Sequence, residues 1–193
     1  MKILTNSYKH RKKWLLIFVG VFLLSAQTGY WIPISDSDAQ ILYDTFLNSL
    51  PEISESTITL HNFSLNLVMF IPGFGMVFGA FTAIQTGIAF NVANIVNDMS
   101  FEVTPALVLL VTPFGLMELF AYAIAMSRSF ILMTSLKNIM KMEKSSRNKI
   151  LKNQIKGVSI DVGIVGLLLI AGGIIEYWMI TEIGNILDYV DLI

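Results

Sequence analysis

The chain has 193 residues, of which 54 % are hydrophobic and only 14 % are charged, and its mean hydropathy is +0.67. Soluble domains carry about a quarter charged residues, so this composition indicates a membrane protein rather than an ordinary soluble domain. A net charge of -1 without a basic surface excludes nucleic acid as a partner, and the lack of cysteine excludes disulfides and thiolate metal sites.

The first apolar run covers residues 14–32 and follows a basic amino-terminal segment, residues 1–13. Its length is close to the roughly 20 residues that a transmembrane helix needs. We interpret it as a retained anchor, because Leu24-Ser25-Ala26 places a large residue where a signal-peptide cleavage site prefers a small one. Tyr30 and Trp31 then fall where an interfacial aromatic belt is expected.

Residues 33–61 form the next segment, a predicted extracytoplasmic loop that contains a short amphipathic helix over 35–50. Ser35 and Asp38 have the spacing of a capping box, and Pro51 stops the helix. Apolar residues recur on one face of this helix. They are Ala39, Leu42, Tyr43, Phe46, Leu47 and Leu50. We expect the helix to lie on the outer membrane surface or to pack over the outer helix ends.

The helical membrane core is predicted at residues 62–127, with about three crossings. A full span at 63–83 precedes a break near 82–86 and a short, asparagine-rich segment at 87–97 that either crosses or re-enters. Another span covers 105–126. A basic connector at 128–157 leads to the last transmembrane helix at 158–181, and an acidic tail at 182–193 follows.

The distribution of charge orients these segments, because short cytoplasmic loops collect Lys and Arg. Five of the thirteen basic residues precede the first span, and eight lie in or beside the connector. Ten of the fourteen acids fall in segments assigned to the outside, and Glu143 alone lies in a cytoplasmic loop. The pattern predicts a multi-pass plasma-membrane protein with about five spans, a cytoplasmic amino terminus and an extracytoplasmic carboxyl terminus. The fold class is therefore an all-α transmembrane bundle.

Three acids, Glu118, Asp161 and Glu176, remain inside the predicted spans, and no Lys or Arg lies there to neutralise them. A charged residue at the bilayer centre costs about 2.5 kcal/mol or more, so such residues are candidate functional sites. They are either protonated or hydrogen-bonded to nearby asparagines. The candidates are Asn62, Asn66, Asn91 and Asn94.

Glu118 lies deepest in its span, which makes it the best candidate for a proton-coupled or ion-binding residue. A protonated acid that hydrogen-bonds across a helix interface is the structural alternative. Asp161 and Glu176 are about 22 Å apart along one helix. We expect Asp161 to be a helix-start acid near the cytoplasmic interface, within reach of water or Lys156, and Glu176 to lie near the outer end.

Two spans carry faces of small residues that allow close helix packing in lipid. They comprise Gly73, Gly75 and Gly79 in one span and Gly163, Gly166 and Gly172 in the other. Packing within the chain is favoured over dimerisation. Ten methionines fit ordinary gap filling better than copper binding. With no catalytic, nucleotide-binding or metal-binding motif, we expect no catalytic residues, no cofactor and no metal, and therefore no enzyme.

Three stretches together resemble the stage II sporulation protein M family of small polytopic membrane proteins. The first is His61-Asn62 followed by Gly75, Gly79 and Asn91. The second is 112–121, TPFGLMELFA, in which Phe114 stands where the family has a His. The third is 168–176, LLIAGGIIE. The resemblance implies a non-enzymatic helical membrane protein that acts through partners, and it singles out Glu118 and Glu176.

Two functions from different classes remain open. The leading one is a scaffold, assembly or accessory subunit that packs against other integral membrane proteins or itself in the lipid bilayer. Such a subunit would fit a larger enzyme complex of the oxidoreductase or monooxygenase type. The alternative is a small transporter or channel whose intramembrane carboxylates line a pathway.

Overall fold

The computed structural model describes residues 11–49, 54–98, 103–140 and 144–190, and all its regular elements are α-helices. The expected all-α fold class is confirmed. Residues 1–10 of the predicted basic segment and residues 191–193 of the predicted acidic tail lie outside the described residues. The helices are α2 (Arg11–Tyr30), α3 (Asp36–Ser49), α4 (Glu55–Met69), α5 (Phe74–Val96), α6 (Pro105–Val111), α7 (Pro113–Ile139) and α8 (Lys144–Val190).

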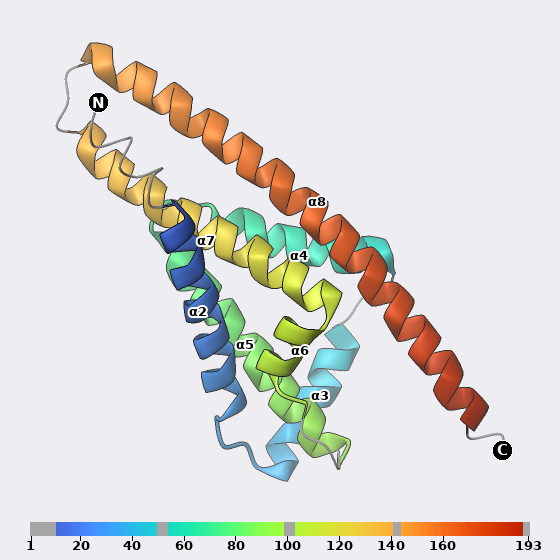
Figure 1. The fold of residues 1–193 in the computed structure, drawn as a ribbon. Coiled ribbons are helices and arrows are strands. Elements are labelled where there is room, and N and C mark those ends of the chain that lie inside the picture. Colours follow the sequence, from blue (N-terminus) through green and yellow to red (C-terminus); the bar gives the residue numbers. More distant parts are fainter. Residues whose placement is uncertain (1–10, 50–53, 99–102, 141–143, 191–193) are drawn as a thin grey trace.

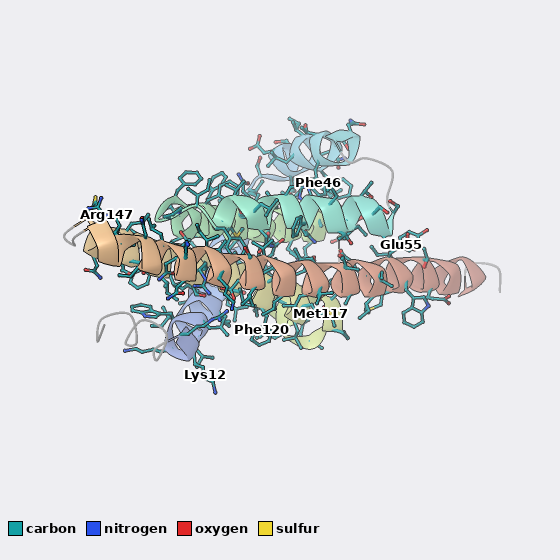
Figure 2. All side chains as sticks on the ribbon, turned by 90° about the horizontal axis from the view of Figure 1, so that it is seen from above. Lys12, Phe46, Glu55, Met117, Phe120 and Arg147 are labelled. Atoms are coloured by element: carbon teal, nitrogen blue, oxygen red, sulfur yellow. The ribbon has the colours of Figure 1, made fainter. Side chains whose placement is uncertain are left out.

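The bundle is built around α7, whose apolar stretch is 61 % buried. Phe22 of α2, Met69 of α4 and Leu169 of α8 all contribute to the core that surrounds it. Helices α2 and α5 pack side by side on one flank of α7, and α8 runs past its other flank (Figure 1). Seen from above, α8 lies across the bundle with α4 along one side and α2 on the other (Figure 2). The beginning of α2 and the end of α8 lie at opposite ends of the molecule (Figure 1).

Among the described residues, four helices are long and apolar enough to cross a membrane: α2, α5, α7 and the Ile150–Glu182 part of α8. The fifth element that runs along the bundle is α4, which has 15 residues. Its first turn lies against Gly173 of α8, and Pro72, just beyond its end, lines a cleft with Ser159. Residues 159 and 173 of one helix are about 21 Å apart. Helix α4 therefore covers most of a bilayer core of about 30 Å, which agrees with about five spans.

The predicted break at 82–86 is wrong, because α5 continues without interruption from Phe74 to Val96. The hydroxyl groups of Thr82 and Thr86 donate to carbonyls four residues earlier, which satisfies them inside the helix. The chain instead breaks at 70–73. Gly73 there has a φ of 79°, a conformation that favours glycine. The predicted short segment at 87–97 is the second half of a full span.

A second break divides the predicted span at 105–126 into α6 and α7. The Thr112 hydroxyl caps α7 by accepting a hydrogen bond from the Gly115 amide at 3.0 Å, and Pro113 occupies the first helical position. Helix α7 then continues to Ile139, and α8 begins at Lys144. The predicted connector at 128–157 is thus largely helical within the described residues.

The two short helices α3 and α4 each begin with a side-chain cap. The Ser35 hydroxyl accepts a hydrogen bond from the Asp38 amide, as expected for the start of α3. Ser54 and Thr57 form a reciprocal capping box at the start of α4. The capping box fixes where α4 begins.

Candidate functional site

A polar cluster lies between α4 and α7. Glu118 and Tyr122 are four residues apart and therefore share one face of α7. Asn62 of α4 joins them: its amide nitrogen donates to a Glu118 carboxylate oxygen, and its amide oxygen accepts a hydrogen bond from the Tyr122 hydroxyl at 3.1 Å. Tyr122 is buried and stacks on Phe22 with 4.8 Å between ring centroids. The cluster thereby links α2, α4 and α7.

Asn66 lies one turn farther along α4, on the same side as Asn62. It is fully buried, and its amide nitrogen donates to the Asn62 backbone carbonyl at 3.1 Å. Its side-chain oxygen is buried and accepts no hydrogen bond. Buried acceptors are normally satisfied, so this oxygen marks a place where a donor is missing.

Glu176 of α8 approaches Glu118 because α7 and α8 run antiparallel. Side chains tilt toward the amino terminus of their own helix, so the two carboxyl groups lean toward the level where Gly172 meets Phe114 and Met117. The two groups interact electrostatically. The Oε2 atom of Glu176 is buried and has no hydrogen-bond partner. Two carboxyl groups from different helices therefore share one low-dielectric region.

Asn91 lies apart from this cluster. Its side chain donates to the Ile32 backbone carbonyl at 2.7 Å, where α2 turns toward α3. Its neighbour Asn94 exchanges hydrogen bonds with the backbone of Val103 at 3.0 and 3.3 Å. Both asparagines thus hold loops at the end of α5, and in the described residues neither contacts one of the three acids.

Asp161 occupies a different environment from the one expected of a helix-start acid near water. It is only 1 % exposed and pairs with two guanidinium groups, those of Arg128 on α7 and Arg11 on α2. Arg128 is also 1 % exposed and donates to the Gly157 carbonyl at 3.3 Å. The expectation that no basic residue neutralises an intramembrane acid is wrong here, because α7 extends past its predicted end and carries Arg128 into the interior.

The glycines of the first small-residue face pack within the chain. A Cβ atom on Gly75 would overlap the Met69 carbonyl group, and one on Gly79 would lie 2.6 Å from the Met126 side chain. Gly73 lies against Met133 at the break before α5. This face therefore fits α5 against the rest of the bundle.

The second small-residue face on α8 divides into two parts. Gly166 lies against the Phe63 ring, and Gly172 lies against Met117. Gly163 is exposed, and a Cβ atom there would meet nothing within 4 Å among the described residues. Of these three glycines, Gly166 and Gly172 serve packing within the chain.

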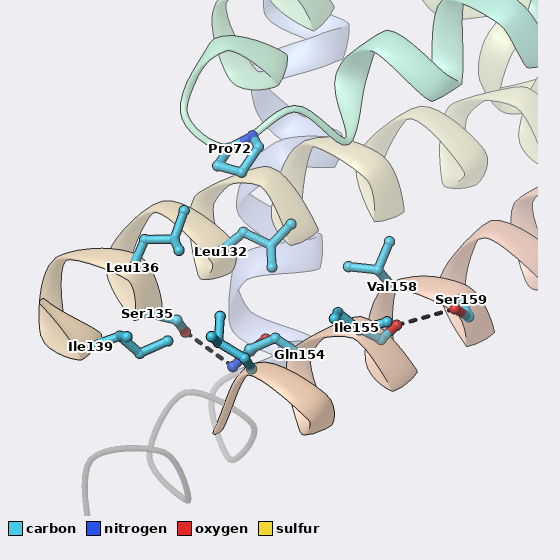
Figure 3. Close-up of a pocket in the computed structure, with 10 residues that line it drawn as sticks. Pro72, Leu132, Ser135, Leu136, Ile139, Gln154, Ile155, Val158 and Ser159 are labelled. Carbon is cyan, nitrogen blue, oxygen red and sulfur yellow. Dashed lines mark hydrogen bonds between the residues drawn. The ribbon is translucent and has the colours of Figure 1, made fainter. Parts of the chain in front are cut away.

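An apolar cleft opens between the end of α7 and the beginning of α8 (Figure 3). Its volume is about 300 Å³, and Leu132, Leu136 and Val158 are among its lining residues. At its base the Gln154 amide nitrogen donates to the Ser135 hydroxyl at 3.1 Å. The Gln154 side-chain oxygen is buried and unpartnered. The cleft suits an apolar group that carries one hydrogen-bond donor.

Sequence reasoning missed three of these polar residues: Tyr122, Arg128 and Gln154. Tyr122 stands four residues after Glu118, and helical spacing was the signal that could have found it. Arg128 falls just after the predicted span at 105–126, in the predicted connector, so the sequence gives no sign of its burial. For Gln154 the sequence offers no signal, since its burial depends on how α7 and α8 pack.

Comparison with known proteins gives one finding. The model of the family described as stage II sporulation protein M matches residues 16–179 of this chain. The match covers the polar cluster, the Arg128 and Asp161 pair and both small-residue faces. No curated protein and no solved structure matches the chain.

Proposed function

Because the chain belongs to the stage II sporulation protein M family, as a multi-pass membrane protein built of apolar helices, we propose that it is a non-catalytic scaffold or accessory subunit. It acts by packing against other integral membrane proteins. The proposal follows from the two small-residue faces. Most of their glycines pack against other residues of the chain, whereas Gly163 on α8 does not.

The observation that supports this function is an uncovered apolar face on α8. Large apolar residues recur along it at spacings of three and four. Their side chains are between 40 % and 71 % exposed: Ile160, Ile164, Leu167, Ile170, Ile174 and Trp178. The apolar stretch of α8 is 28 % buried, as is that of α2, compared with 22 % for α5 and 61 % for α7.

Gly163 lies within this face. Successive helix residues are rotated by about 100°, which places Gly163 between Ile160 and Leu167 and on the same side as Ile170. An open glycine among large apolar side chains makes a notch into which another transmembrane helix can fit closely. The other small positions, including Gly79 and Gly172, are already occupied by side chains of this chain. We therefore assign the partner contact to α8.

The test uses two glycines that are both open in the described structure. Gly163→Leu fills the notch on α8, whereas Gly20→Leu places the same side chain on α2, where a Cβ atom also meets nothing within 4 Å. We expect Gly163→Leu to insert normally and to lose the proteins that co-purify with the wild type in mild detergent. Gly20→Leu should keep them. Equal retention of partners by both variants would remove α8 as the docking face.

A small transporter is the second candidate, and the two helix interruptions favour it. The breaks at 70–73 and at Thr112 precede α5 and α7, and transporter sites often lie beside interrupted helices. Glu118→Gln should abolish proton flux in reconstituted liposomes while leaving assembly intact. Wild-type liposomes that carry no proton flux would exclude a proton-coupled transporter and leave the accessory subunit.

A further inference from the structure

We propose that the apolar cleft between α7 and α8 binds one anionic phospholipid, with an acyl chain in the cleft and the headgroup beside the lysines of α8. The cleft lies apart from the proposed docking face, because its lining residues Leu151, Ile155 and Val158 do not belong to that face. The shape of the cleft, a buried polar atom inside it and the charge around it together support this ligand.

The shape of the cleft suits a single acyl chain. Leu136 of α7 and Ile155 of α8 line it and are exposed, so the cleft opens on the outside of the bundle, where a lipid can enter (Figure 3). Its volume of about 300 Å³ is at the lower end of the range for ligand pockets. A transmembrane helix, which is about 10 Å wide with its side chains, is too large for it.

A buried polar atom distinguishes this cleft from a purely apolar groove. Gln154 lines the cleft and is only 4 % exposed. Its amide nitrogen donates to the Ser135 hydroxyl at 3.1 Å, whereas its amide oxygen is buried and has no hydrogen-bond partner. Buried acceptors normally have a donor, which a hydrocarbon chain cannot supply. The ligand therefore carries a donor, such as a headgroup hydroxyl, close to its apolar chain.

The charge beside the cleft is positive. Lys152 and Lys156 are exposed, and each lies two residues from Gln154, which is about 3 Å along the helix axis. Lys152 also lies two helical turns before the lining residue Ser159 and so shares its side of α8. Residues 128–156 contain eight basic residues and one acid. Basic pockets between transmembrane helices attract anionic lipid headgroups, so the charge favours an anionic lipid over a neutral one.

Native mass spectrometry of the full chain, released from nanodiscs with equal amounts of phosphatidylglycerol and phosphatidylcholine, tests the proposal. Phosphatidylglycerol is anionic and has headgroup hydroxyls, whereas phosphatidylcholine is zwitterionic and has none. We expect the wild type to retain one phosphatidylglycerol. Leu136→Trp, which fills the cleft, should lose it. Leu24→Trp makes the same change at an exposed position on α2 and should keep it.

Two further variants test the charge and the polar atom. Replacing both Lys152 and Lys156 by Gln should lower the preference for phosphatidylglycerol by about fivefold for each lysine. The matched control replaces Lys12 and Lys13 by Gln, because these lysines are exposed on α2 and do not line the cleft. Gln154→Leu should lower the retention of phosphatidylglycerol, because it removes the acceptor for the headgroup hydroxyl.

Three results would overturn the proposal. They are a wild type that retains no lipid or both lipids equally, retention of phosphatidylglycerol by both Leu136→Trp and Gln154→Leu, and an equal loss of preference in the two lysine double variants. The last would show a general attraction to the membrane surface instead of a site. The two lysines of α8 are exposed, so their replacement tests the site even if a variant inside the cleft does not fold. Gly163→Leu should keep the lipid, which separates this site from the docking face.

Discussion

At the scale of single residues, the contact whose loss we expect to cost most is the buried ion pair of Arg128 and Asp161. Removing one partner of such a pair leaves an uncompensated buried charge, which costs about 3–5 kcal/mol. We therefore expect Arg128→Met and Asp161→Leu each to lower the unfolding free energy in mixed micelles by about that amount. The double variant, with both charges replaced by apolar groups, should recover most of the loss.

Arg11 is the internal control for this prediction. Its side chain is 37 % exposed although it also pairs with Asp161, so water screens its charge. Arg11→Ala should cost at most about 1 kcal/mol. A loss for Arg11→Ala as large as that for Arg128→Met would contradict the prediction, because it would show that the exposed guanidinium stabilises Asp161 as much as the buried one does.

The three intramembrane acids show what a sequence can say about single residues. Their cost in lipid makes Glu118, Asp161 and Glu176 visible as candidate sites without a structure. Their partners are not visible, because Arg128 and Asp161 are 33 residues apart and Asn62 and Glu118 are 56 apart. Pairing across such separations is set by the packing of whole helices. It was therefore possible to predict the acids but not which of them is neutralised.

At the scale of helices, α2 and α5 approach each other closely enough for backbone contact at two glycines. A Cβ atom on Gly87 would overlap the Ala26 carbonyl oxygen, and one on Gly29 would overlap the backbone of Ile84. Backbone atoms cannot move aside as a flexible side chain can, so Gly87→Ala must separate the helices. Overpacking of this kind costs about 1–3 kcal/mol. We expect that loss in the unfolding free energy, measured in mixed micelles.

Gly20→Ala is the control for Gly87→Ala, since the added methyl group meets nothing within 4 Å. Alanine is favoured over glycine in a helix by up to about 1 kcal/mol, so this variant should be neutral or slightly more stable. Destabilisation of equal size in both variants would mean that glycine flexibility, rather than the α2 and α5 contact, explains the effect.

Helix boundaries were the least predictable part of the fold. Hydropathy alone cannot locate a break inside a continuous apolar run, and the polar residues at 82–86 suggested the wrong place. Within a helix, Thr82 and Thr86 satisfy their hydroxyl groups on earlier carbonyls, so they do not end it. Proline and glycine, which restrict or relax the backbone, predict the breaks better: Pro72-Gly73 precedes α5 and Thr112-Pro113 begins α7.

At the scale of the whole molecule, the number of crossings follows from charge more securely than from hydropathy. Hydropathy and length identify four helices. The separation of basic and acidic segments predicts an odd number of crossings between residues 60 and 128. With α5 and the combined α6 and α7 segment as two of them, we expect α4 to supply the third. Helix α4 contacts α8 at Gly173 through its first turn and at Gly166 through Phe63, so it runs along α8.

Single cysteines test this topology directly, because the natural chain contains none. Asp44 and Asp98 are exposed before α4 and after α5, and Asn153 is exposed near the beginning of α8. If α4 crosses, Asp44→Cys and Asp98→Cys should both react with an impermeant maleimide added to intact cells. Asn153→Cys should react only after the membrane is permeabilised, since it lies among the basic residues. If α4 does not cross, Asp44→Cys and Asp98→Cys will lie on opposite sides, so their labelling will differ. Both side chains are exposed, so either cysteine is accessible to the maleimide on its own side of the membrane.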